Sequence, residues 1–226
     1  DVEAFQYASE DLRSDSEVAL FALLRSPAAL EHVGSDLLAK RDFMLMAVEL
    51  NHEAAGKMAQ ELWNDPAILA ALITHDGMLL QQASPKVRSD KAVVLAAVGQ
   101  NGLALQHAAE ELRNDMQVVL TALRQNGSAL KHVSDDLLAD REVVLYGLQQ
   151  NEYMLRFAAP GLLADPDFIL AAIQQSTAAF LYASESLRTD RLFVMTAVQQ
   201  DGLVLDHAPS EMQEDREIAL LAVAQN

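Results

Sequence analysis

Hydrophobic and polar residues recur along the chain in one fixed order every 25 residues. Each repeat opens with an aspartate, except at Lys40, and the residue eight positions later is always Leu, Ile or Val. The opening aspartates are Asp15, Asp65, Asp90, Asp115, Asp140, Asp165, Asp190 and Asp215. No insertion or deletion interrupts the order, so we expect a single continuous array over residues 1–226. The array comprises a partial repeat 1–14, complete repeats starting at residues 15, 40, 65, 90, 115, 140, 165 and 190, and a partial repeat 215–226.

Each repeat is predicted to be a small helical hairpin. Apolar residues three, four, five, seven and eight positions after the opening residue follow the 3.6-residue period of an amphipathic first helix. The opening aspartate is a natural N-cap, and Asp65-Pro66 and Asp165-Pro166 place proline where a helix tolerates it best. We expect this helix to stop at sequences such as Asn101-Gly102, because Asn and Gly readily adopt the left-handed closing conformation.

A second helix is predicted over stretches such as LALQHAAEEL, residues 103–112. Pro85, Pro160 and Pro209 interrupt its end in three repeats, so the last turn there is expected to be a separate short helical turn. Two short helices cannot enclose a core alone, whereas stacked repeats bury each other's apolar faces. The predicted fold class is therefore all-α, an α-solenoid of stacked helical hairpins. An alternative for repeats this short pairs the first helix with a mostly 3₁₀ segment.

The charge balance of the chain narrows the classes of partner. Sixteen basic residues against thirty-three acidic ones give a formal net charge of −17. Such a surface repels nucleic-acid phosphates and anionic lipid and attracts basic partners, so no nucleic-acid partner is expected. No apolar run approaches the roughly 18 residues of a membrane span, so no membrane insertion is expected. The absence of cysteine excludes disulfides and cysteine-based metal sites and favours a cytoplasmic location.

The repeats share a consensus, D-x-E-V-V-L-x-A-V-x-Q-N-G-x-A-L-x-x-A-S-x-x-L. It is legible in DREVVLYGLQQN, in NGLALQHAAEELRND and in DREIALLAVAQN. The consensus resembles the repeat of the domain-of-unknown-function family numbered 4116, and the resemblance covers the whole chain. It implies a tandem array of the kind found in bacterial and protist proteins, some of them secreted effectors, which makes the cytosol of a host a second expected location. It implies no catalytic residues; Lys40, Glu152 and the Ala55-Gly56 pair depart from the pattern.

Histidines occupy one column of the repeat, which also holds aromatic residues. The column contains His32, His107, His132 and His207 beside Tyr7, Phe157 and Tyr182. Equivalent positions in adjacent layers lie about 10 Å apart, whereas metal ligands lie about 2 Å from one ion. We therefore predict a half-buried packing position and no metal. No catalytic or phosphate-binding motif occurs, so neither a cofactor nor enzyme activity is expected.

Acidic pairs recur at one place in the repeat and form what we call the acidic stripe. Its members are Glu10, Asp11, Glu110, Glu111, Asp135 and Asp136. Nearby basic columns, which include Arg41 and Arg141, favour a solvated ladder of inter-repeat ion pairs, each worth about 0–1 kcal/mol. The alternative is a stripe that docks a basic partner or mimics nucleic acid. Paired catalytic carboxylates need unequal, enclosed environments, which a repeated exposed ridge does not supply.

Large apolar residues at columns that are otherwise small or polar are candidate anchors for a partner. They are Trp63, Tyr146, Tyr153, Leu181, Leu192, Phe21 and Met46. The alternative is that they fill gaps between repeats. A contiguous cluster of four of them on one solvent face, namely Tyr146, Tyr153, Leu181 and Leu192, would favour partner binding.

Three functions are consistent with these features. The first is a non-catalytic scaffold that binds a protein or peptide, with a basic partner favoured by charge. The second is a structural spacer or assembly subunit of a larger complex. The third is a non-catalytic region of a larger protein such as a secreted effector. Neither end of the chain has a polar capping repeat, so we expect a segment of a longer array.

Overall fold

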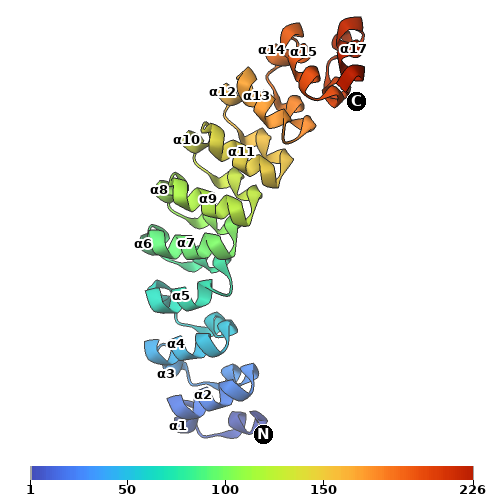
Figure 1. The fold of residues 1–226 in the computed structure, drawn as a ribbon. Coiled ribbons are helices and arrows are strands. Elements are labelled where there is room, and N and C mark those ends of the chain that lie inside the picture. The colour runs from blue at the N-terminus through green and yellow to red at the C-terminus, as the bar shows by residue number, and fades with distance from the viewer. Residues whose placement is uncertain (1, 226) are drawn as a thin grey trace. The chain divides into compact units, whose positions relative to one another are not determined.

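The computed structural model describes residues 2–225; Asp1 and Asn226, the first and last residues of the predicted array, lie outside the described residues. All regular structure in the described part is helical, with no strand (Figure 1). The α-solenoid class, a stack of helical repeats, is confirmed. Contacts group the chain into two compact units, Asp1–Leu112 and Arg113–Asn226, which are described separately. The 25-residue repeat continues through both.

Unit 1 contains four long α-helices, each followed by a 3₁₀-helix and then a short helical segment. In the repeat that starts at Lys40 this third segment is the 3₁₀-helix η4. The long helices are α2 (Ser16–Arg25), α4 (Arg41–Leu50), α5 (Pro66–Ile73) and α7 (Lys91–Gln100). The 3₁₀-helices are η1 (Val2–Tyr7), η2 (Pro27–His32), η3 (His52–Lys57), η4 (Gln60–Asn64), η5 (Gly77–Gln82) and η6 (Gly102–His107). The short helices are α1 (Glu10–Arg13), α3 (Ser35–Leu38), α6 (Pro85–Arg88) and α8 (Glu110–Arg113), which contains the unit boundary.

Unit 2 follows the same order of elements. Its long helices are α9 (Met116–Gln125), α11 (Arg141–Gln150), α13 (Pro166–Ile173), α15 (Arg191–Gln200) and α17 (Arg216–Gln225). Its 3₁₀-helices are η7 (Gly127–His132), η8 (Glu152–Phe157), η9 (Thr177–Tyr182) and η10 (Gly202–His207). Its short helices are α10 (Asp135–Leu138), α12 (Pro160–Leu163), α14 (Glu185–Arg188) and α16 (Ser210–Gln213).

The repeats therefore contain three helical segments, and the prediction of a continuous second helix is wrong. In the repeat that starts at Asp90, the 3₁₀-helix η6 ends at His107 and the short helix α8 begins at Glu110. The break occurs equally in repeats without proline, so proline is not its cause. The alternative of an α-helix followed by a 3₁₀ segment is confirmed.

A backbone hydrogen bond between neighbouring repeats explains the break. The amide of Ala109 donates to the carbonyl of Arg88 in the preceding repeat, at 3.0 Å. In unit 2 the amide of Ser184 donates to the carbonyl of Leu163 in the same way, at 2.7 Å. In a continuous helix these amides would bond to the carbonyl four residues earlier. The interruption frees them to join one layer to the one before.

The aspartates that open the repeats are confirmed as N-caps. Asp90, for example, accepts hydrogen bonds from the amides of Ala92 and Val93 at the start of α7. The other seven opening aspartates also accept from one or two amides of the following first turn. Lys40 provides no side-chain cap to α4. The recurrence of aspartate at this position is therefore explained by its role as a helix N-cap.

The Asn-Gly sequences do not close the long helices in the left-handed conformation, so that prediction is wrong. No residue between 2 and 225 has a positive φ, and Asn101 is extended, with φ −143°. Its side chain instead caps the 3₁₀-helix that follows by accepting from the amide of Leu103 at 3.1 Å. The glycine allows close approach of the next repeat: a Cβ added at Gly77 would lie 2.3 Å from the carbonyl oxygen of Ala97.

The core of each unit is the apolar face of its long helices packed against the neighbouring long and 3₁₀-helices. In α7 the buried residues are Val94, Ala97 and Val98, which follow the predicted helical period. Leu80 and Leu105, from η5 and η6, are fully buried beside them. Among the described residues, no helix is long and apolar enough to span a membrane.

Candidate functional site

The seven apolar candidates divide into exposed and buried residues. Side chains at five of these positions are exposed: Phe21, Met46, Tyr153, Leu181 and Leu192. Tyr146 is half-buried in α11. Trp63 is only 9% exposed, so the expectation that it lies at the surface is wrong. Its column is half-buried even where it holds Arg88, because it lies at the last residue of the short helix, which packs on the next long helix.

The exposed candidates of unit 2 do not form one cluster of four. Tyr153 lies on η8 and Leu181 on the neighbouring η9, whereas Tyr146 and Leu192 lie on the long helices α11 and α15. Leu203 on η10 is also exposed and occupies the position equivalent to Tyr153. Residues three apart share a face of a 3₁₀-helix. Tyr153, Leu181 and Leu203 therefore form an apolar group on the 3₁₀-helices of unit 2.

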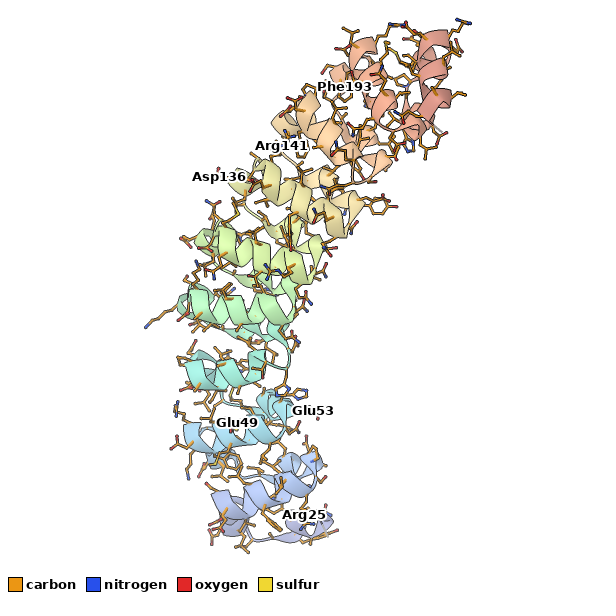
Figure 2. The ribbon with its side chains drawn as sticks, in the orientation of Figure 1. Arg25, Glu49, Glu53, Asp136, Arg141 and Phe193 are labelled. Carbon is orange, nitrogen blue, oxygen red and sulfur yellow. The ribbon has the colours of Figure 1, made fainter. Side chains whose placement is uncertain are left out.

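The acidic stripe is exposed at all six positions. In unit 1 its pairs lie on α1 and α8, and in unit 2 one pair lies on α10. None of the six carboxylates makes an ion pair with a residue between 2 and 225; Asp136, labelled in Figure 2, accepts only a long hydrogen bond of 3.5 Å from Asn114. At the equivalent place in α6 stand Pro85 and Lys86, so the stripe of unit 1 is not continuous.

Basic residues pair instead with the aspartates that cap the next repeat. The Nε of Arg41 lies 2.6 Å from Asp65, and that of Arg191 lies 2.8 Å from Asp215. Arg141, labelled in Figure 2, lies 3.7 Å from Asp165. The predicted inter-repeat ion pairs therefore exist, but they leave out the acidic stripe. These pairs recur at multiples of 50 residues, so two 25-residue repeats form the larger period.

The ion pair with Arg41 helps to lower the pKa of Asp65. Burial acts to raise the pKa of Asp65, but hydrogen bonds from Arg41 and from the amides of Ile68 and Ala67 outweigh it and lower the pKa. Oδ1 accepts from the two amides and, at 3.4 Å, from Arg41, while Oδ2 accepts from the Nε of Arg41. A single side chain thus caps its own helix and joins it to the preceding repeat.

The four histidines of the column are half-buried, as predicted, and so are Phe157 and Tyr182, whereas Tyr7 is 83% exposed and departs from the prediction. Burial, and secondarily the charge of Arg88, lower the pKa of His107, which favours the neutral imidazole. Outside this column, the rings of His52 and His75 stack with centroids 4.9 Å apart. Within residues 2–225, no group of three or more His, Asp or Glu side chains is placed to hold a metal ion.

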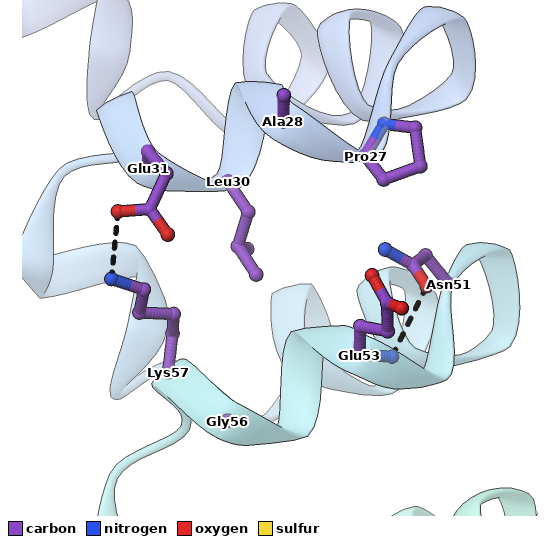
Figure 3. Close-up of a pocket in the computed structure, with 8 residues that line it drawn as sticks. All are labelled: Pro27, Ala28, Leu30, Glu31, Asn51, Glu53, Gly56 and Lys57. Carbon is purple, nitrogen blue, oxygen red and sulfur yellow. Dashed lines mark hydrogen bonds and ion pairs between the residues drawn. The ribbon is translucent and has the colours of Figure 1, made fainter.

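A groove of about 450 Å³ lies between η2 and η3 of unit 1 (Figure 3). Its lining residues are Pro27, Ala28, Leu30, Glu31, Asn51, Glu53, Gly56 and Lys57. The two 3₁₀-helices form opposite walls, with Leu30 pointing into the space from one side and Glu53 from the other.

Two residues on η3 are smaller than their equivalents in other repeats; Gly56 lines this groove, whereas Ala55 is buried and does not line it. Ala55 stands where six other complete repeats have Leu and one has Phe, and Gly56 stands where the other repeats have longer side chains such as Gln81 and Gln106. A Cβ added at Gly56 would meet no atom within 4 Å. The sequence marked Ala55-Gly56 as irregular, but it did not indicate that the missing side chain of Gly56 leaves a space at the surface.

Asn51 presents an unpaired donor at the groove. Its Oδ1 caps η3 by accepting from the amide of Glu53 at 3.1 Å, while its Nδ2 is buried with no hydrogen-bond partner. In the repeat that starts at Asp140, the equivalent Asn151 donates to the hydroxyl of Ser128 in the preceding repeat. For Asn51 the corresponding residue is Ala28, which has no side-chain acceptor.

The groove carries one net negative charge. Lys57 is paired with Glu31, with 2.8 Å between Nζ and Oε2. Hydrogen bonding to Lys57 and its charge lower the pKa of Glu31. The carboxylate of Glu53 has no ion pair or hydrogen bond with any described residue and points into the space (Figure 3). The groove therefore offers an acceptor, Glu53, and a donor, Asn51, side by side.

Comparison with known proteins supports the repeat assignment. No curated protein and no solved structure matches the chain. The model of one family, described as a domain of unknown function, matches residues 67–113, 90–138, 140–188 and 190–226. The longest of these matches span two 25-residue repeats, in agreement with the 50-residue period of the arginine–aspartate pairs. On this evidence the chain belongs to the DUF4116 family of tandem helical repeats.

Proposed function

We propose that the chain is a non-catalytic scaffold that binds a basic protein or peptide segment. The observation that carries the proposal is the state of the six stripe carboxylates, which are exposed and have no cationic partner within residues 2–225. Three arginines outside the stripe, Arg41, Arg141 and Arg191, pair instead with capping aspartates. Exposed, uncompensated acidic charge favours association with basic partners.

Exposed apolar side chains supply the second component of a binding surface. Tyr153, Leu181 and Leu203 lie on consecutive 3₁₀-helices of unit 2, and each is more than half exposed. An aromatic or branched anchor that becomes buried on association contributes much of the energy of an interface. The surrounding charges would then determine which partner is accepted.

The non-catalytic part of the proposal rests on the environment of the carboxylates. A catalytic pair needs one carboxyl group in an apolar, enclosed setting that separates its pKa from that of its partner. The pairs of the acidic stripe, for example Glu110 and Glu111, are equally open to solvent. Each pair is therefore suited to contact with a basic segment of a partner.

A binding experiment with an immobilised set of basic, neutral and acidic dodecapeptides tests the proposal. The complete chain should retain basic peptides preferentially, and retention should fall as the ionic strength rises from low to physiological salt. The double variant Glu110→Gln/Glu111→Gln should weaken retention more than Glu49→Gln, which removes an exposed charge from α4 outside the stripe. Equal retention of acidic and basic peptides would contradict the proposal.

A further inference from the structure

We propose that the groove between η2 and η3 binds one basic residue of a peptide, taking its cationic side chain at Glu53 and its main-chain carbonyl at Asn51. This inference rests on the proposed function and deepens it, because it assigns a site and a recognition chemistry to the basic partner. Each of its three elements follows from an observation within unit 1.

The first element is the space itself. Gly56 lines the groove and omits a side chain that the other repeats supply, and the space around it is unobstructed. On the facing wall, Pro27 and Ala28 add no polar group that could reach across (Figure 3). A side chain from outside can therefore occupy the space beside Gly56.

The second element is the unpaired amide of Asn51. Its Nδ2 is buried and lacks an acceptor, and a donor left unsatisfied in such a position is costly. Asn151 satisfies the equivalent donor with Ser128, whereas Ala28 offers Asn51 nothing. A ligand that carries a carbonyl oxygen would satisfy this donor.

The third element is charge. Because Glu31 already neutralises Lys57, the carboxylate of Glu53 is the uncompensated charge of the groove. It attracts a cation and disfavours an anion. A carbonyl beside a cation is the combination that an arginine or lysine residue in a peptide presents, with main-chain and side-chain groups a few bonds apart.

The ligand chemistry is tested directly at the Asn51 amide by nuclear magnetic resonance. We would titrate the ¹⁵N-labelled full chain at low salt with a blocked Gly-Arg-Gly peptide. The same peptide with citrulline keeps the carbonyl without the charge, and spermidine keeps the charge without the carbonyl. The Nδ2 resonances of Asn51 should shift when the arginine peptide is added. The same shift should need a roughly fivefold higher concentration of the citrulline peptide, and spermidine should cause no shift. Equal shifts with all three probes would overturn the assignment.

Two variants, each with a matched control, test the location. Gly56→Gln restores the side chain that other repeats carry and should weaken binding of the arginine peptide by at least about tenfold. Gly161→Gln, at a second glycine with open space around it, should leave binding unchanged. Glu53→Gln should weaken binding roughly fivefold. Glu49→Gln removes the same charge from a nearby site outside the groove, seen with Glu53 in Figure 2, and should change binding less than about twofold.

The outcomes separate this inference from the proposed function. Wild-type affinity in Gly56→Gln, with basic dodecapeptides still retained, would overturn the groove and leave the scaffold function standing. If the unmodified chain retained no basic peptides, the scaffold function itself would be overturned. Equal losses in Glu53→Gln and Glu49→Gln would show that only the general acidity of unit 1 matters, and would overturn the groove.

Discussion

Two interfaces between neighbouring repeats of unit 1 have the same backbone plan and different outcomes. Between η5 and η6, the amide of Gly77 donates to Oε1 of Gln100 at 2.7 Å, and Nε2 of Gln100 donates to the carbonyl of His75 at 2.9 Å. Between η2 and η3, the equivalent positions hold Pro27, which has no amide hydrogen, and Leu50, which has no carboxamide. The first interface is closed by this bridge, whereas the second contains the groove.

The comparison teaches that the groove is a coordinated departure from the repeat. Three changes occur in this pair of repeats: Pro27 and Leu50 remove the bridge, and Gly56 removes a side chain at the groove. Each alone would be a small defect in a stack. Together they leave an accessible site, while the Asn51 cap of η3 and the apolar core of α4 are retained.

The filling leucine of the closed interface should be the most sensitive position. Leu80→Ala should lower the free energy of unfolding by about 2–5 kcal/mol, because Leu80 is 0% exposed and its truncation leaves a cavity. Urea unfolding followed by circular dichroism measures the loss. In the open interface Leu30 stands at this position, and Ala55 stands where the closed interface has Leu105. A loss below about 0.5 kcal/mol in Leu80→Ala would mean that the two interfaces do not differ in packing as described.

The two glycines at these interfaces should respond in opposite ways to the same change. Gly77→Ala should destabilise by about 1–3 kcal/mol, because its Cβ would collide with the carbonyl of Ala97. Gly56→Ala should be neutral or stabilising by up to about 1 kcal/mol, since the site is open and alanine restricts the unfolded chain. Unfolding midpoints of the two variants provide the measurement. Similar destabilisation in both would contradict the distinction between close approach and open space.

Helix capping also distinguishes the repeat that starts at Asp90 from the one that starts at Lys40, with a smaller expected effect on the free energy of unfolding. Asp90→Ala should cost about 1 kcal/mol, because the amides of Ala92 and Val93 lose their acceptor. Lys40→Asp should add about 0.5–1 kcal/mol by giving α4 the cap that it lacks. Differential scanning calorimetry of the two variants checks both signs. An unchanged melting temperature for Lys40→Asp would mean that another group already satisfies the first turn of α4.

The smallest effect should appear in acid, at the Arg41–Asp65 pair. The folded pKa of Asp65 lies below its ordinary value of 3.8, so its contribution to stability is present above that value and is lost as the pH falls through the folded pKa. Arg41→Gln should raise the pKa of Asp65 and make stability less dependent on pH in this acidic window. The carbon-13 shift of the Asp65 carboxylate, followed by titration, reports the change. An unaltered titration midpoint would show that the helix amides alone lower the pKa.

Much of the architecture could be predicted because it depends on local chemistry repeated many times. The period of 25 residues, the apolar face of helices such as α7 and the N-cap role of Asp90 each follow from neighbouring residues. Capping and amphipathicity act within one or two turns, so the sequence determines them directly. For the same reason the departures at Lys40 and at Ala55-Gly56 were visible without coordinates.

Contacts between repeats were decided only in the tertiary structure. The second helix breaks because Ala109 donates to the carbonyl of Arg88, and Gly77 is required because Ala97 of the next repeat approaches it. Trp63 is buried for a related reason, since its short helix packs on the following long helix. The groove between η2 and η3 needs residues from two repeats at once, and its unpaired groups, Asn51 and Glu53, are defined by what the neighbouring repeat fails to supply. The sequence of one repeat determines the helices and caps of that repeat. The packing and the spaces between repeats depend on the side chains of two neighbouring repeats in contact.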